Sequence, residues 1–220
     1  MRVAVFLFVW LAALLWPVAG RAQVEMENRL RAFIDSEPYQ KLLESGLGHI
    51  PPVVFKRCPS LVRGSPEISI LRPVSFGADG APNAGLWRHS FAVSGCGNDT
   101  VLNFFFVARP DGKLDPVIGL PGTTHADLVL QRDSVAYANA GAAVAIKGCR
   151  EFYVTNTRFE GGGVPQRSLP NQTAGRGDLS HAWRESWTVA GCGHVADVPM
   201  EFVPDQSGTQ IIQPGGAKQR

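Results

Sequence analysis

A tryptophan-to-glycine segment occurs twice in this chain, and this duplication constrains the fold more than any other feature. Residues 87–112 align without gaps with residues 183–208 at a constant offset of 96, and ten of the 26 aligned positions are identical. Two unrelated segments of ordinary composition would share about two. Both segments carry Gly-Cys-Gly at the same place. The sequence therefore predicts two tandem copies of one unit, at residues 23–116 and 117–220.

Each copy has the same predicted order of elements: a helical stretch, a cysteine, a β-rich run, a loop rich in glycine, and the tryptophan segment. In the first copy the helical part is expected to end at Gly46. In the second copy a helix is expected over residues 123–148, with Thr124 as its N-cap. The β-rich runs are residues 67–76 and 151–159. We expect an α+β fold of roughly α-β-β-β per copy, with antiparallel hairpins. The copies either share one sheet or pack as a pseudo-dimer.

Strand alternation predicts that each tryptophan segment is a hairpin that turns at its cysteine. Placing the apolar residues of both strands on one face fixes the register, because a slip by one residue moves every side chain to the other face. The expected pairs are Trp187–Val198, Glu185–Met200, Trp183–Phe202 and, on the reverse face, Arg184–Glu201 in the second copy, and Phe91–Leu102, His89–Phe104 and Trp87–Phe106 in the first. The glycine on each side of the cysteine permits the positive φ angles of a tight turn.

The first 22 residues have the features of a secretory signal peptide. An arginine precedes an apolar run, and small residues lead to the expected cleavage site after Ala22. Loss of Arg2 and Arg21 would take the formal net charge from +2 to zero. We therefore expect a periplasmic or secreted protein with no stable membrane span after cleavage. Because no basic cluster is visible, we expect no nucleic-acid partner.

All four cysteines follow this segment, and their even number favours disulfides in an exported protein. Exchanging the two copies leaves each of the three connectivities unchanged, so symmetry selects none of them. Shorter loops and independent folding of each copy favour Cys58–Cys96 and Cys149–Cys192. Closing each loop would stabilise the fold by about 4 kcal/mol in the chain-entropy model. The competing interpretation of Cys192 is a reactive thiol beside His194, but the first copy has Asn98 at that position.

Glu185 is unusual because it lies on the predicted apolar face between two tryptophans. A carboxylate there must be paired, solvated or shifted in its pKa. One interpretation is an edge position where the carboxylate reaches water or an arginine. The other is a ligand-binding stripe in which indoles stack on a flat ligand. The candidate ligand-binding residues are Trp183, Glu185 and Trp187 and, at matching positions of the first copy, Trp87 and His89.

The remaining motifs indicate no cofactor and no metal. The five histidines do not cluster, and the zinc-protease, P-loop, dinucleotide-binding and nucleophile-elbow motifs are absent. We therefore assign no catalytic residue from these motifs.

The W-R-E-S-W-T-V-A-G-C-G segment and the residues after it resemble a segment of uncharacterised exported bacterial proteins. The likeness covers about thirty residues of the second copy and, more loosely, the first, where His89 and Phe91 depart from the pattern. It implies a periplasmic or secreted location and carries no reaction or cofactor.

Two functions follow from these observations as hypotheses. The first is a non-catalytic binding or assembly protein of the cell envelope, whose partner would be a glycan or an envelope protein. The alternative is an envelope hydrolase that acts on glycan or cell-wall material through Glu185. Exposure of Trp183 separates ligand binding from a purely structural role, because a fully packed indole cannot meet a ligand.

Overall fold

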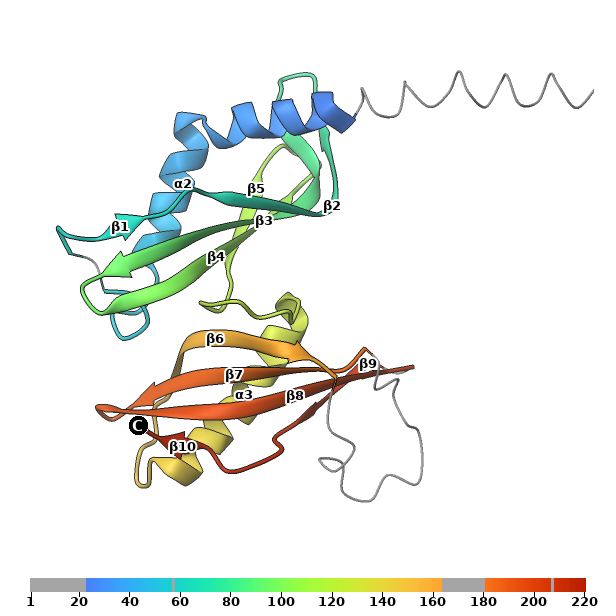
Figure 1. Cartoon of the computed structure of the whole chain (residues 1–220). Coiled ribbons are helices and arrows are strands. Elements are labelled where there is room, and N and C mark those ends of the chain that lie inside the picture. The colour runs from blue at the N-terminus through green and yellow to red at the C-terminus, as the bar shows by residue number, and fades with distance from the viewer. Residues whose placement is uncertain (1–22, 57, 164–180, 207) are drawn as a thin grey trace, which may run out of the picture. The chain divides into compact units, whose positions relative to one another are not determined.

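The computed structural model describes residues 23–56, 58–163, 181–206 and 208–220. Within these residues the fold is α+β, as expected, with three helices and two antiparallel sheets (Figure 1). The helices are residues 23–34, α2 (Glu37–Gly48) and α3 (Leu128–Ala145). The strands are β1 (Val62–Arg63), β2 (Glu67–Phe76), β3 (Pro82–Gly95), β4 (Asn98–Ala108), β5 (Leu114–Ile118), β6 (Tyr153–Gly162), β7 (Trp183–Gly191), β8 (His194–Asp205), β9 (Gly208–Ile212) and β10 (Lys218–Gln219).

The chain forms two compact units. The first consists of the described residues up to Gly48 together with Ile68–Arg88 and Phe105–Val117. The second consists of His49–Glu67, His89–Phe104 and Ile118–Arg220. The expected boundary between tandem copies at residues 116 and 117 stays a prediction, as does the signal peptide, which lies outside the described residues. None of the described helices is long and apolar enough to cross a bilayer.

In the part of the chain that the structure describes, each sheet has five strands and is built around one long hairpin. The first has the order β1-β3-β4-β5, with β2 also paired to β3. The second has the order β10-β8-β7-β6, with β9 also paired to β8. The three strands expected per copy are therefore too few. The additional strands are two to five residues long, too short for an alternating pattern to reveal them.

The core of the first unit brings α2 against aromatic side chains of the strands. Tyr39, Leu43 and Leu47 are spaced by four residues along α2 and are all buried. The ring of Tyr39 lies 4.7 Å from that of Phe106 and 6.4 Å from that of Trp87. The expectation that this helix ends at Gly46 is wrong, because Leu47 continues the buried stripe and the helix extends to Gly48.

The helix α3 covers one face of the second sheet (Figure 1). Its small residues Ala138 and Ala142 are fully buried in the same core as Val198. A Cβ at Gly141 would lie 2.7 Å from Val198 Cγ1, so only glycine permits this close approach. The core-facing residues of β7 and β8 are Trp187, Val189, Ala196, Val198, Met200 and Phe202.

Thr124 is not the N-cap of α3, contrary to the expectation. The cap is Asp127, whose Oδ1 accepts a hydrogen bond from the Leu130 amide at 2.9 Å. Thr124 is buried instead, and its hydroxyl accepts from the Ala126 amide. Threonine and aspartate are both good N-cap residues. Asp127 is the cap because it lies three residues before the Leu130 amide, which needs an acceptor in the first turn of the helix.

The expected register of the second hairpin is confirmed. Trp187 pairs with Val198, Glu185 with Met200, and Trp183 with Phe202. Arg184 lies opposite Glu201 on the reverse face, as expected.

Both hairpins turn at a Cys-Gly pair whose residues have positive φ. The values are 58° and 84° at Cys96 and Gly97, and 50° and 79° at Cys192 and Gly193. Positive φ at both central residues is the mark of a type I′ turn, whose twist matches that of the flanking strands. The Gly-Cys-Gly segment therefore has a structural role at both sites.

Both disulfides have the expected connectivity. Cys58 is bonded to Cys96 and Cys149 to Cys192, with Cα–Cα distances of 6.3 and 5.8 Å. No free cysteine remains. Each bond ties a hairpin turn to the chain 38 or 43 residues earlier.

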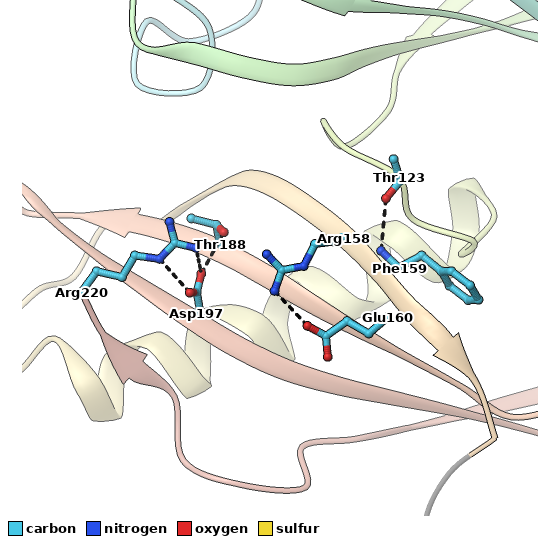
Figure 2. Close-up of polar contacts among 7 residues, drawn as sticks. All are labelled: Thr123, Arg158, Phe159, Glu160, Thr188, Asp197 and Arg220. Atoms are coloured by element: carbon cyan, nitrogen blue, oxygen red, sulfur yellow. Dashed lines mark hydrogen bonds and ion pairs between the residues drawn. The ribbon is translucent and has the colours of Figure 1, made fainter.

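A polar cluster fixes the last residue of the chain to the second sheet (Figure 2). Asp197 accepts two hydrogen bonds from the guanidinium of Arg220, at 2.7 and 2.8 Å, and one from the hydroxyl of Thr188 at 2.9 Å. The amide of Arg220 also donates to the carbonyl of Val195. The C-terminal strand β10 is therefore held by side chains as well as by its ladder.

Candidate functional site

Glu185 is buried on the apolar face of β7, where the sequence placed it. Only 1% of the residue is exposed. Its strand neighbours Trp183 and Trp187 project to the same face, because side chains alternate along a strand. Met200 lies opposite on β8. The edge position expected under one interpretation, with the carboxylate in water or on an arginine, does not match this environment.

Three N–H donors converge on the carboxylate of Glu185. The indole N–H of Trp183 donates to Oε1 at 2.8 Å, and the indole N–H of Trp187 donates to Oε2 at 2.7 Å. The third donor is the backbone amide of His125, 2.8 Å from Oε1. Hydrogen bonds to an ionised acceptor are about twice as strong as neutral ones, so this arrangement offsets the cost of burying the group.

The third donor reaches Glu185 because the segment before α3 is bound along β6. The amide of Thr123 donates to the carbonyl of Thr157 at 2.7 Å, and the hydroxyl of Thr123 accepts from the amide of Phe159 (Figure 2). Gly122 makes the approach possible, because its φ is +103° and a Cβ there would lie 2.0 Å from the carbonyl oxygen of Thr157. His125 lies three residues after Gly122, so this close approach directs its backbone amide at the carboxylate of Glu185.

Three aromatic residues adjoin Glu185 through the indole of Trp183, the backbone amide of His125 and the strand pairing of Phe159, and each has exposed surface; we call them the aromatic rim. Trp183 is partly buried and its ring stacks on Phe202 at 4.9 Å. The exposed imidazole of His125 stacks on the partly buried ring of Phe159 at 3.8 Å, with 8° between the planes. Phe159 is the β6 partner of Glu185. The rim therefore consists of aromatic residues with exposed surface, one of which the buried carboxylate of Glu185 holds by a hydrogen bond.

The other candidate residues lie inside the protein. Trp187 and Trp87 have no exposed surface, and His89 is 3% exposed. The indole of Trp87 donates to the hydroxyl of Tyr39 at 3.2 Å, and burial raises the pKa of that tyrosine. Burial also lowers the pKa of His89 to about 4, so the imidazole is neutral at physiological pH. Contact of a ligand with these three side chains would require the core to open, and their predicted role stays a prediction.

The geometry suits Glu185 to orienting the two neighbouring indole rings. Both carboxylate oxygens already accept hydrogen bonds from groups of the protein, and two of the donors are the indoles on either side. The carboxylate thereby fixes the plane of Trp183, the only one of these tryptophans with exposed surface.

The sequence analysis missed His125 and Phe159 as members of this site. His125 lies 60 residues from Glu185 in the chain and contributes its backbone amide, which no residue pattern reveals. Phe159 belongs to a strand that was expected, but its pairing with β7 depends on tertiary structure. Among the described residues, no group of three or more His, Cys, Asp or Glu side chains is placed to hold a metal ion.

Comparisons with protein-family models, curated proteins and solved structures gave no match to this chain. The resemblance of the second tryptophan segment to exported bacterial proteins accordingly stays a prediction.

Proposed function

We propose that this chain is an exported protein of the cell envelope that acts by binding or assembly, and that its aromatic rim is the contact surface. The observation that carries the proposal is the triple hydrogen bonding of Glu185. A general acid or base needs an oxygen that is free to exchange a proton with the substrate. Glu185 is only 1% exposed, and N–H groups of the protein occupy three of the roughly four acceptor positions of its carboxylate.

We further propose that the two hairpins descend from one duplicated unit. Strands β3 and β7 end at Gly95 and Gly191, and β4 and β8 begin at Asn98 and His194. These positions differ by the same offset of 96 that aligns the sequences. Equivalent turn angles and equivalent disulfides support the same conclusion.

The partner that best fits the rim is a glycan. Sugar rings present flat C–H faces that stack on indole, phenyl and imidazole rings, while their hydroxyls stay in water. A peptidoglycan strand in the periplasm offers this chemistry. Two disulfides suit an oxidising compartment, where such bonds persist.

The test is co-sedimentation of the purified protein with peptidoglycan sacculi. Trp183→Leu should lower binding at least tenfold, because it removes the stacking surface. Trp183→Phe should retain most of it, since a phenyl ring can still stack on Phe202. Tyr137→Phe, on the exposed side of α3, is the control and should bind as the wild type does. Equal binding by wild type and Trp183→Leu would exclude the rim as the contact surface.

The same samples test the hydrolase alternative and export. Release of soluble reducing sugars from the sacculi by the wild type, lost in a Glu185→Gln variant that circular dichroism shows to be folded under the assay conditions, would establish the enzyme. N-terminal sequencing of protein from the periplasmic or secreted fraction should begin at Gln23. A chain that retains Met1 would contradict the proposed export.

A further inference from the structure

A cavity of about 310 Å³ lies in the second unit. It is lined by the segment after α2, by β4, by residues 118–121, by α3 and by the start of β6. No residue of the aromatic rim lines it. The side chains that form most of its wall are aliphatic or aromatic, among them Leu102, Leu120, Val135 and Val154.

Among the described residues of the wall there is one amide side chain, that of Asn103, and its hydrogen bonds are made within the protein. Oδ1 of Asn103 accepts from the hydroxyl of Ser90 at 2.8 Å. Its Nδ2 donates to the carbonyls of Leu120 and Gly122, at 2.9 and 3.0 Å. Asn103 is 5% exposed. It therefore braces the wall and offers no remaining N–H to a ligand.

The backbone of the adjoining segment is satisfied in the same way. The amide of Leu120 donates to Oε1 of Gln131 at 2.9 Å, and the amide of Gly119 donates to the carbonyl of Asn103 at 2.9 Å. Tyr153, another lining residue, directs its hydroxyl to the carboxylate of Glu151. A polar ligand entering this cavity would lose its hydration and gain few hydrogen bonds in return. The wall selects an apolar ligand.

The size of the cavity decides what kind of apolar ligand fits. A cavity of about 150 Å³ lined by aliphatic and aromatic groups binds one benzene molecule. A single Phe or Leu side chain from a partner protein would therefore fill about half of the space. Scaling from the six carbons of benzene, the cavity holds a chain of about twelve carbons. The mouth includes His49 and Ile118, both exposed, so a head group there would stay in water.

We propose that this cavity binds one hydrocarbon chain of about twelve carbons, the tail of a fatty acid or of a single-chain lipid. The proposal goes beyond the proposed function and rests on different residues. A negative result for the cavity would not bear on the proposed role of the aromatic rim, and a negative result for the rim would not bear on the cavity.

The first experiment is calorimetric titration of the full mature protein with saturated fatty acids below their micellar concentrations. Affinity should rise about fourfold per methylene from hexanoate to dodecanoate and then level off at hexadecanoate. Lauroyl lysophosphatidylcholine, titrated in parallel, identifies the source. If the lysolipid binds more tightly than dodecanoate, the natural ligand is a membrane lipid; if it binds more weakly, the ligand is a free fatty acid. An affinity that does not depend on chain length, or no binding of either probe, would overturn the proposal.

The second experiment fills the cavity. Val135→Phe places a ring in the cavity from α3. Val129→Phe makes the same change at a residue of that helix that is 59% exposed and does not line the cavity. Dodecanoate should bind at least tenfold more weakly to Val135→Phe and unchanged to Val129→Phe. Ile118→Trp narrows the mouth from a position that is 40% exposed, so it tests the site even where Val135→Phe does not fold. Wild-type affinity in a folded Val135→Phe or in Ile118→Trp would refute the assignment.

Discussion

Replacing Glu185 with glutamine should destabilise the protein markedly, although the two side chains have nearly the same shape. The carboxylate accepts three N–H groups, two at Oε1 and one at Oε2. A glutamine side chain has one carbonyl oxygen and one NH₂ group. With its oxygen toward Trp183 and His125, the NH₂ group faces the indole N–H of Trp187, and two donors oppose each other.

The magnitude follows from these bonds. Loss of one charge-assisted hydrogen bond in a buried site costs about 1.5–3 kcal/mol, and the two remaining bonds each weaken by about 1 kcal/mol when the acceptor becomes neutral. Removal of the buried charge offsets part of this loss. We expect the free energy of unfolding of Glu185→Gln to fall by about 3 kcal/mol. For a chain of this size that lowers the unfolding temperature by about 6–12 °C.

Glu185→Met separates hydrogen bonding from the cost of burying a charge. If the hydrogen bonds dominate, methionine leaves all three donors without an acceptor, and stability decreases in the order wild type, glutamine, methionine. If desolvation of the carboxylate dominates, the methionine variant is the most stable of the three.

The assay is urea unfolding of the mature protein with its disulfides intact, followed by tryptophan fluorescence and circular dichroism. Glu160→Gln is the matched control, because Glu160 is exposed and bonded to Arg158 at 2.9 Å (Figure 2). A surface pair of this kind contributes at most about 1 kcal/mol. The reasoning would be refuted if the free energy of unfolding of Glu185→Gln were within 0.5 kcal/mol of the wild-type value, or if that of Glu185→Met were higher than the wild-type value.

Three further predictions concern the turns and the buried polar groups. Opening the second disulfide with the double variant Cys149→Ser, Cys192→Ala should lower the free energy of unfolding in urea by about 4 kcal/mol. Asparagine in place of alanine at position 192 should recover about 1 kcal/mol, because asparagine tolerates the positive φ that this turn requires before glycine. Equal stabilities of the two double variants would contradict the type I′ assignment. Because the pKa of His89 is lowered to about 4 in the folded state, the unfolded state takes up the proton first as the pH falls from 6.5 to 4. Stability should therefore drop by up to about 3 kcal/mol over this range in the wild type relative to His89→Phe, and parallel pH profiles would exclude this cause. Tyr39→Phe should cost about 1–2 kcal/mol by removing the acceptor of a buried indole N–H, whereas Tyr137→Phe on the surface should change unfolding by less than 0.5 kcal/mol.

The register of the second hairpin and both disulfides could be predicted because they depend on local patterns. Alternating apolar residues on two adjacent strands leave one pairing that keeps Trp187 and Val198 on the same face. Cysteine count and loop length then favour pairing within each half. The short strands β1, β5, β9 and β10 escaped prediction, because their positions depend on pairing with a neighbour and two to five residues carry no clear period.

The candidate site was predictable only in part. The burial of Glu185 between two tryptophans follows from strand alternation, so its polarity marked it as unusual. Its third hydrogen bond comes from the backbone of His125, which a separate segment brings to β6. Every residue has a backbone amide, so the sequence cannot indicate which one a buried carboxylate will meet. The cavity wall is likewise assembled from segments that are far apart in the sequence, so no local pattern indicates it.

The two halves provide different acceptors for the indole N–H groups of the aligned tryptophans, and this difference explains why one ring is buried and the other partly exposed. In the first half, Tyr39 on α2 accepts the indole N–H of Trp87, and the tryptophan is fully buried. In the second half the acceptor of Trp183 is Glu185 on the same strand. An acceptor from the strand needs no covering helix residue over the indole, so the ring can remain partly exposed. Glu185, which aligns with His89 of the first half, therefore allows Trp183 to remain partly exposed.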